Sequence, residues 1–82
     1  MIKLELLSKS ECYLCEEMKR VLSRATQGID VNLREVDIEL EPELLERYGE
    51  QIPVLFVNGV EVFKHCVTEG KLRSRLLHEI GE

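Results

Sequence analysis

The chain has 82 residues, of which 44% are hydrophobic and 33% are charged. This length predicts one domain over residues 1–82, and this composition excludes a disordered tract or a collagen repeat. The formal net charge of −5 is the opposite of the basic excess that contacts with nucleic-acid phosphates require, so no nucleic-acid partner is expected. The 3 cysteines are too few, and an odd number, for a secreted disulfide scaffold.

We expect no export signal at the start of the chain. Lys3 and Glu5 interrupt its apolar residues, so the hydrophobic segment of a signal peptide cannot form there. The longest near-continuous apolar run, residues 52–57, is far shorter than the roughly 20 residues of a membrane helix. We therefore expect a cytoplasmic protein without a membrane partner, where a cysteine pair is more often catalytic or metal-binding than a permanent crosslink.

A strand followed by a helix is predicted for the first third of the chain. Ile2, Leu4 and Leu6 alternate with charged residues, which indicates a strand that ends near Leu7. Apolar residues then recur at helical spacing, namely Leu14, Met18, Val21, Leu22 and Ala25. Gly28 is expected to end this helix.

A second strand and a short helix follow. Residues 31–38 are rich in β-branched side chains and predict the strand. Pro42, flanked by Glu41 and Glu43, is typical of a first helical turn, because proline lacks the N–H that would be unpaired there and acids suit the positive end of the dipole. The expected buried face of this helix is Leu44, Leu45 and Tyr48. Gly49 is expected to end it.

The last third predicts a hairpin and a helix. Residues 53–57 and 60–63 flank Asn58-Gly59, the dipeptide that supplies the two positive φ values of a type I′ turn. Thr68 is expected to cap a final helix. The apolar stripe of that helix is Leu72, Leu76, Leu77 and Ile80, and Gly81 follows it.

The predicted order of elements is β-α-β-α-β-β-α. Strands that alternate with helices pair in parallel through right-handed crossovers, whereas the closing hairpin adds antiparallel strands. The sequence therefore predicts an α/β fold in which helices flank a mixed four-stranded sheet.

Cys12 and Cys15 stand where the first strand gives way to the first helix. The free N–H groups and partial positive charge of a helix N-terminus favour thiolate over thiol. Residues three apart lie one helical turn from each other, close enough for a disulfide. Cys12, the outer residue, would attack a substrate disulfide and Cys15 would resolve the mixed disulfide. A metal site and structural thiols remain alternatives for a single C-x-x-C motif.

Pro53 is the second unusual feature, because it follows Ile52 at the start of a strand that should be central. Proline cannot donate to a strand ladder, so one interpretation is an edge strand or an ordinary strand start. The other is a cis peptide bond, which is essentially a proline feature and typically marks a tight functional turn. The cysteine pair elsewhere in this topology favours the cis bond.

Several other polar groups have two interpretations. Zinc could take Cys12 and Cys15 with His65 or Cys66, although adjacent ligands fit the usual spacing poorly. We expect Cys66 to be a small buried side chain, with a third redox thiol as the alternative, and His65 to lie in a loop. Residues 35–50 hold seven acids and one Arg. This acidic run predicts a solvated face, and selection of a basic partner is the alternative.

The whole chain resembles the glutaredoxin-like proteins of the thioredoxin-like superfamily, in particular the small bacterial proteins with a C-x-L-C motif. The resemblance is carried by C-Y-L-C at residues 12–15, by Lys9 three residues earlier, by V-D-I-x-x-x-P-E-L at residues 36–44 and by I-P-V-L-F-V-N-G at residues 52–59. It implies the thioredoxin-like (glutaredoxin) fold, with Cys12 as nucleophile, Cys15 as resolving thiol and Pro53 in the cis-proline place.

The resemblance also implies a substrate groove. Lys9 and Tyr13 match positions that line the thiol-substrate groove in glutaredoxins, and the backbone of Ile52 would pair with a bound thiol or peptide. The chain departs from the family where Tyr13 replaces the usual proline. It also departs at residues 63–66, Phe-Lys-His-Cys, where glutaredoxins place a Gly-Gly pair and an acid that contact glutathione. These bulkier side chains put glutathione binding in doubt.

The electrostatic balance at the cysteine pair is open from the sequence. Glu11, Glu16 and Glu17 would disfavour a thiolate, whereas Lys9 and the helix dipole would favour one. The first hypothesis is a monomeric thiol–disulfide oxidoreductase with no bound cofactor, which acts on protein or low-molecular-weight disulfides. Its reductant would be glutathione or a thioredoxin-reductase-like flavoprotein. The alternative is a non-catalytic binding module of the same fold with structural or metal-binding cysteines.

Overall fold

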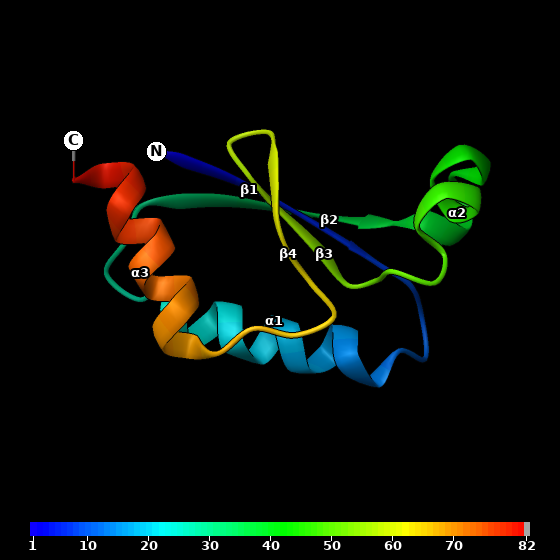
Figure 1. The fold of residues 1–82 in the computed structure, drawn as a ribbon, viewed down its shortest axis with the longest axis horizontal. Coiled ribbons are helices and arrows are strands. Elements are labelled where there is room, and N and C mark those ends of the chain that lie inside the picture. Colours follow the sequence, from blue (N-terminus) through cyan, green and yellow to red (C-terminus); the bar gives the residue numbers. More distant parts are fainter. Residues whose placement is uncertain (82) are drawn as a thin grey trace.

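The computed structural model describes residues 1–81 (Figure 1). Its elements are β1 (Ile2–Ser8), α1 (Tyr13–Ala25), β2 (Val31–Asp37), the 3-10 turn η1 (Ile38–Leu40), α2 (Pro42–Tyr48), β3 (Val54–Val57), β4 (Val60–Lys64) and α3 (Glu69–Ile80). The predicted order of strands and helices is therefore confirmed. The turn η1 was not predicted. In it, the Asp37 side chain accepts a hydrogen bond from the backbone N–H of Glu39 and bends the chain out of β2.

The four strands form one mixed sheet in the order β2-β1-β3-β4. The central strand β1 runs parallel to β2 and antiparallel to β3, so that Leu4 lies opposite both Leu33 and Val57. The hairpin of β3 and β4 closes the sheet on the other side. This arrangement is the α/β thioredoxin-like fold that the sequence predicts, with helices flanking the sheet.

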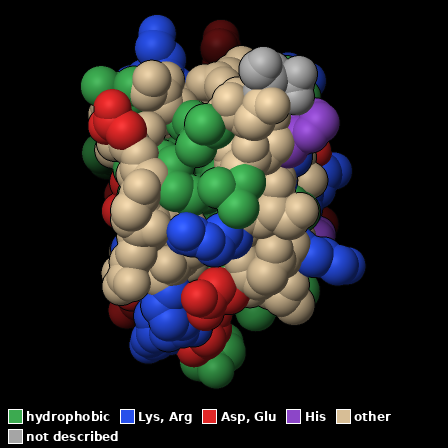
Figure 2. Space-filling model, turned by 90° about the vertical axis from the view of Figure 1, so that its left-hand side faces the viewer, with side chains coloured by type: hydrophobic (Ala, Val, Ile, Leu, Met, Phe, Trp, Pro, Cys, Tyr) green, Lys and Arg blue, Asp and Glu red, His purple; other side chains and the backbone are tan. Residues whose placement is uncertain are grey.

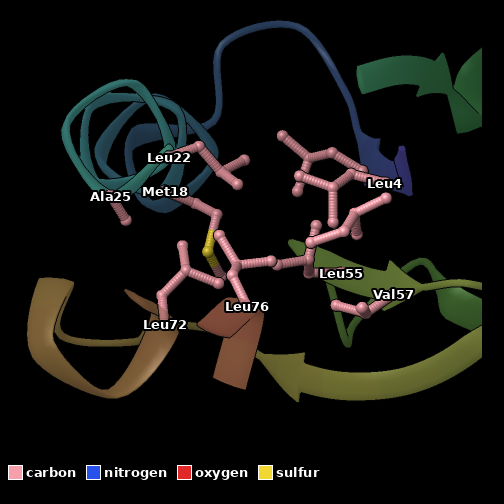
Figure 3. Packing of buried hydrophobic residues seen from close by; sticks show 10 residues of the cluster. Leu4, Met18, Leu22, Ala25, Leu55, Val57, Leu72 and Leu76 are labelled. Atoms are coloured by element: carbon pink, nitrogen blue, oxygen red, sulfur yellow. The ribbon is translucent and has the colours of Figure 1, made fainter. Parts of the chain in front are cut away.

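The main core lies between the sheet and the helices α1 and α3, which cover the same face (Figure 1). Figure 3 shows side chains from both helices pointing toward those of β1 and β3. The cluster consists of Ile2, Leu4, Leu6, Met18, Leu22, Ala25, Leu55, Val57, Leu72 and Leu76. Each fully buried side chain of leucine size contributes about 1.5–3 kcal/mol relative to exposure, so this layer supplies most of the hydrophobic stabilisation.

A second cluster lies at the end of the sheet where α2 packs. It consists of Leu7, Cys15, Ile38, Tyr48, Ile52 and Val54. The ring of Tyr48 meets the half-buried ring of Phe56 edge to face, with centroids 6.2 Å apart. The two rings therefore serve in packing, as their positions in the sequence indicate.

Local turn and cap signals act as predicted. Asn58 and Gly59 have φ values of 49° and 85°, which confirms the tight hairpin turn. The Thr68 side chain accepts a hydrogen bond from the backbone N–H of Lys71 at 3.2 Å and caps α3. Pro42 occupies the first turn of α2. Each feature depends on neighbours in sequence, which is why a sequence pattern finds it.

The end of α1 differs from the prediction. The helix ends at Ala25, three residues before Gly28, which has a φ of 78° in the following turn. The guanidinium of Arg73 donates hydrogen bonds to the carbonyl oxygens of Ala25 at 3.0 Å and of Gln27 at 2.9 Å. These contacts from α3 satisfy carbonyls at a helix end that otherwise lack partners. A distant residue thus contributes hydrogen bonds at this helix end, beside the local bonds from the Thr26 hydroxyl and backbone N–H to the carbonyl oxygen of Leu22.

Several apolar residues that the sequence predicts to be buried are exposed, namely Leu14, Leu45, Leu77 and Ile80. Each helix has only one packed face. In α3, Leu72 and Leu76 fill the contact with the core, so the neighbouring Leu77 points elsewhere. In α2, the contact is made by Tyr48 and the half-buried Leu44. Periodicity therefore located the helices but assigned too wide a buried stripe to each.

Figure 2 views the end of the molecule at which the chain starts and α3 ends. Apolar side chains gather in the middle of that face, with Lys and Arg side chains beside them (Figure 2). The N-terminal end of α1, which carries the cysteine pair, lies at the opposite end of the molecule (Figure 1). Within residues 1–81, no helix combines the length and apolar character needed to cross a membrane.

Candidate active site

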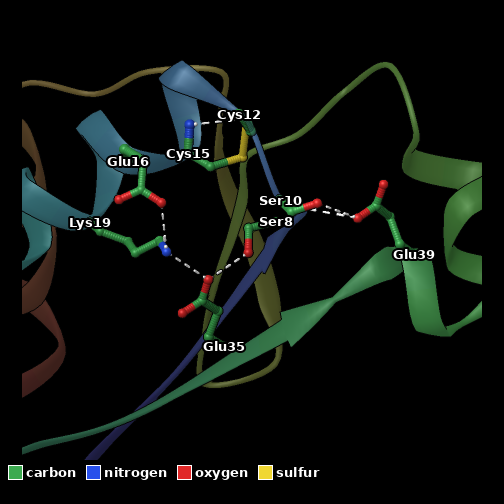
Figure 4. Close-up of polar contacts among 8 residues, drawn as sticks. All are labelled: Ser8, Ser10, Cys12, Cys15, Glu16, Lys19, Glu35 and Glu39. Atoms are coloured by element: carbon green, nitrogen blue, oxygen red, sulfur yellow. Dashed lines mark hydrogen bonds and ion pairs between the residues drawn. A yellow bond between two sulfur atoms is a disulfide. The ribbon is translucent and has the colours of Figure 1, made fainter.

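The two cysteines of the C-x-x-C motif form a disulfide at the N-terminus of α1 (Figure 4). Their Cα atoms lie 5.2 Å apart, which is within the usual range for a disulfide. Cys12 is the N-cap residue, and its Sγ accepts a hydrogen bond from the backbone N–H of Cys15 at 3.2 Å. Cys12 is half-buried, whereas Cys15 has 0% of its surface exposed. The outer sulfur is thus the accessible one, in the order that the sequence predicts.

The loop before the cysteines is bonded to the turn that follows β2. Glu11 turns the chain with a φ of 55° immediately before Cys12. Ser10 lies two residues before Cys12. Its hydroxyl donates a hydrogen bond to Glu39 Oε1 at 2.9 Å (Figure 4). Because Glu39 lies in η1, this contact places the turn after β2 beside the loop that presents the dithiol.

Ile52 and Pro53 lie beside the cysteine pair in space. Cys15 and Ile52 belong to the same buried cluster, and Cys12 packs against it. The Ile52–Pro53 peptide bond is cis, which confirms that interpretation of the proline. Within residues 1–81, the backbone N–H and C=O of Ile52 make no backbone hydrogen bond. These two backbone groups lie next to the dithiol and are free of backbone hydrogen bonds within the described residues.

The two remaining predicted site residues are placed differently. Tyr13 begins α1 directly after Cys12, and 73% of its surface is exposed. Lys9 is half-buried in the loop after β1 and lines a small hollow together with Lys19 and Glu35. Tyr13 therefore stands at the mouth of the site, whereas Lys9 lies toward the β2 side of the loop.

A polar network that the sequence did not reveal lies under the first turns of α1. The Lys19 amino group lies 3.0 Å from Glu16 and 2.9 Å from Glu35, and the buried Ser8 donates a hydrogen bond to Glu35 at 2.7 Å (Figure 4). The Ser8 hydroxyl, followed by Lys19, lowers the pKa of Glu35 below its ordinary value. The hydrogen bonds from Lys19 to Glu35 and then to Glu16 raise the pKa of Lys19. The Glu16–Lys19 pair has a local i,i+3 spacing, but no local pattern pairs Glu35 with Ser8 or Lys19, since β2 brings Glu35 to them.

The acids that follow the cysteines are thus paired. Glu16 contacts Lys19, and Glu17 forms an ion pair with Arg20. The charges of Glu16 and Glu17 close to Cys12 are balanced by adjacent cations, whereas the exposed Glu11 forms no ion pair within residues 1–81. The balance that the sequence left open therefore shifts toward stabilisation of a thiolate.

Cys66 is exposed, so the prediction of a buried side chain was wrong. The reason is that Cys66 lies beyond the end of β4, in the segment that leads to α3. His65 lies in the same segment, as predicted, with a φ of 68°. The described residues, 1–81, contain no group of three or more His, Cys, Asp or Glu side chains arranged to hold a metal ion.

Comparisons with known proteins identify the family and the fold of the chain. The family model described as Glutaredoxin-like domain (DUF836) matches residues 3–77. The solved structure of protein XcR50 from X. campestris has 25% sequence identity and a TM-score of 0.78, with 92% of this chain and 96% of that chain covered. Protein Ne2328 from Nitrosomonas europaea has 25% identity and a TM-score of 0.76, with 92% and 91% covered.

The fold extends to thioredoxins. A mutant thioredoxin from Halobacterium salinarum has 21% identity and a TM-score of 0.66, with 94% of this chain and 73% of that chain covered. At this identity the likeness shows the fold alone.

Proposed function

We propose that this chain, which belongs to the Glutaredoxin-like domain (DUF836) family, is a thiol–disulfide oxidoreductase. The single observation that carries the proposal is the Cys12–Cys15 disulfide at the N-terminus of α1, with one sulfur accessible and the other buried. A structural crosslink needs no such asymmetry. An exchange site does, since the attacking sulfur must meet the substrate and the resolving sulfur must stay behind it.

The reaction starts from the reduced dithiol. The Cys12 thiolate attacks one sulfur of a substrate disulfide, the substrate S–S bond breaks, and its other sulfur leaves as a thiolate. The Cys15 thiolate then attacks Cys12 Sγ in the mixed disulfide, which releases the second substrate thiolate and forms the Cys12–Cys15 disulfide. Two electrons pass from the dithiol to the substrate, and the leaving thiolates take up the protons that Cys12 and Cys15 lose.

The surroundings of Cys12 support a reactive thiolate. The backbone N–H of Cys15 points at its sulfur from 3.2 Å, and the partial positive charge of the α1 N-terminus acts on the same atom. Glu16 and Glu17 are paired with Lys19 and Arg20 and oppose this field only weakly. These features lower the cost of charge on the outer sulfur.

The backbone beside the dithiol supports substrate binding in an extended form. Ile52 offers an N–H and a C=O without backbone partners, next to the cis Pro53 and the cysteines. An extended peptide would add to this edge as a short strand. Tyr13 would contact the substrate from the other side of Cys12, and Lys9 would act at longer range through its charge.

The reductant that closes the cycle is proposed to be a thioredoxin-reductase-like flavoprotein rather than glutathione. At residues 63–66 the chain carries Phe-Lys-His-Cys, without a glycine, in the stretch where the glutaredoxin pattern has the glycines that let backbone approach glutathione closely. The His65 backbone keeps a positive φ, but its side chain occupies space that a glycine would leave free.

The test is insulin reduction by the protein, run in parallel with each donor. One reaction contains NADPH, glutathione and glutathione reductase, and the other contains NADPH and a thioredoxin reductase. We expect turnover that is lost in Cys12→Ser and retained in Cys66→Ser, the matched control at an exposed cysteine. In Cys15→Ser we expect a mixed disulfide at Cys12 to accumulate, which mass spectrometry detects. Absence of turnover with both donors, together with no trapped intermediate, would favour the non-catalytic binding module.

A further inference from the structure

The end of the molecule around the dithiol exposes large apolar side chains. Tyr13 follows Cys12, and Leu40 in η1 is 76% exposed. Leu14 and Leu45 are also exposed by more than 40%. None of these four side chains belongs to either buried cluster. Single exposed apolar residues are ordinary, but a group of them at a reactive centre points to a contact surface.

The turn η1 brings Leu40 to the rim of the site. Ile38, two residues earlier, packs in the same cluster as Cys15 and Ile52. Glu39 accepts the hydrogen bond from Ser10, two residues before Cys12. Figure 4 shows Glu39 and Ser10 facing each other across this junction. Leu40 therefore lies beside the loop that presents the dithiol and is free to contact a substrate.

The same end of the molecule is strongly acidic. Residues 35–50 hold seven acids and one Arg, a formal charge of −6, whereas the whole chain carries −5. The rest of the chain thus sums to +1. Glu35 is engaged by Ser8 and Lys19. Four acids, Glu41, Glu43, Glu46 and Glu50, are exposed, and no cation among residues 1–81 forms an ion pair with them.

The acidic helix borders the site directly. Tyr48 of α2 packs in the same cluster as Cys15 and Ile52, so α2, with its exposed acids, borders the substrate edge. The only Arg of this segment, Arg47, lies over the ring of Tyr48 at 5.3 Å from the centroid. Several unpaired carboxylates of one sign create a local potential that attracts cations and repels anions.

We propose that this face docks an extended, cationic segment of a protein, whose own disulfide is the substrate of the dithiol. An apolar side chain of the segment covers Leu40 and Tyr13, and its Lys or Arg side chains face the α2 acids. Glutathione disulfide is a net anion at neutral pH, so the same field disfavours it. This inference rests on the proposed function and names its substrate class.

The experiment measures the second-order rate constant at which disulfide probes oxidise the pre-reduced protein. Two disulfide peptides share one apolar core and differ only in flanking Lys or flanking Glu residues. Hydroxyethyl disulfide, which is small and uncharged, reports the chemistry alone. We expect the Lys-flanked peptide to react on the order of tenfold faster than the Glu-flanked one at low salt, and the ratio to shrink as salt screens the surface.

Charge-reversal variants locate the effect. Glu46→Lys on the outer face of α2 is expected to remove most of the preference for the Lys-flanked peptide. Asp30→Lys changes the net charge equally at an exposed position whose backbone carbonyl bonds Ile2, at the far end of β1. That control is expected to keep the preference. Leu40→Ser is expected to slow both peptides and to leave the ratio of their two rates unchanged, because it removes apolar contact but no charge.

Failure of this inference is distinct from failure of the proposed function. If hydroxyethyl disulfide and both peptides leave the dithiol reduced, the oxidoreductase itself is refuted. If hydroxyethyl disulfide reacts but the two peptides react at equal rates, or the Glu-flanked peptide or glutathione disulfide reacts fastest, the cationic substrate class is wrong. An equal loss of the preference for the Lys-flanked peptide in Glu46→Lys and Asp30→Lys would also overturn the inference. The preference would then depend on net charge and not on the acids of α2.

Discussion

The backbone N–H of His65 donates a hydrogen bond to the carbonyl oxygen of Pro53, 2.8 Å away. This bond ties the segment after β4 to the turn that flanks the dithiol. His65 makes it with a φ of 68°, in the left-handed region that favours glycine. A side chain at this position therefore costs backbone energy while occupying space beside the site.

Replacement of His65 by glycine tests this cost. We expect His65→Gly to raise the free energy of unfolding by roughly 0.5 kcal/mol, because relief of the left-handed backbone outweighs the added freedom of the unfolded chain. Chemical denaturation measures it. The matched control, His78→Gly in α3, should lower stability by about 0.5–1 kcal/mol. Equal destabilisation of both variants would contradict the argument.

The thiolate prediction concerns Cys12 as a free thiol. In Cys15→Ser/Cys66→Ser, we expect the alkylation rate of Cys12 to reach half its plateau at a pH clearly below about 8.5, the ordinary pKa of a thiol. The reason is the N–H of residue 15 and the terminus of α1, which act on the sulfur. Alkylation kinetics across the neutral and alkaline range measure it, and Cys12→Ser/Cys15→Ser provides Cys66 as an exposed comparator. A midpoint at or above about 8.5 would contradict a terminus-activated thiolate.

The network around Glu35 predicts a pH dependence of stability. The folded pKa of Glu35 is lowered, so its contribution is present above the unfolded value and is lost as pH falls through the folded pKa. Because both partners are partly exposed, with side chains 35% and 44% accessible, we expect Glu35→Gln to cost less than about 1 kcal/mol at neutral pH. The difference from the unmodified protein should vanish in acid. Denaturation at a series of pH values measures this, with Glu50→Gln as the same substitution at an exposed position that forms no ion pair within residues 1–81.

The contribution of Lys19 to stability has the opposite pH dependence to that of Glu35. Its folded pKa is raised, so its contribution is complete below the ordinary value of 10.5 and is lost as pH rises through the folded pKa. The destabilisation caused by Lys19→Met is therefore expected to persist from neutral pH to about pH 10 and to fall above it. Denaturation at a series of alkaline pH values measures it. A difference that grows with alkaline pH would contradict the contacts with Glu35 and Glu16.

Two neighbouring leucines of α3 separate burial from helix position. Leu76 is 0% exposed in the main core, whereas Leu77 is 46% exposed. We expect Leu76→Ala to cost about 2–5 kcal/mol, since it leaves a cavity between α1, α3 and the sheet. Leu77→Ala should cost less than about 0.5 kcal/mol. Thermal and chemical unfolding measure both, and similar losses would contradict the packing of α3.

The sequence identified those features of the fold that depend on neighbours along the chain. Asn58-Gly59 sets its turn through two positive φ values, Thr68 caps α3 through the N–H three residues later, and the alternation of β1 marks which side chains face the core. The C-x-x-C spacing likewise sets a sulfur pair on one helical turn. Such features need no partner from elsewhere, so patterns in the sequence are sufficient to predict them.

Only the tertiary structure decided which surfaces each element meets. The strand order put Glu35 of β2 against Ser8 and Lys19, and the packing of α3 put Arg73 against the carbonyls at the end of α1. Because α3 packs on the sheet and α1 through Leu72 and Leu76, Leu77 is left exposed. Cys66 is exposed because it lies in the segment between β4 and α3. Each outcome depends on which distant segment arrives at a given face. Hydrophobic periodicity gives the direction of a side chain along its own helix or strand but not the neighbour that covers it.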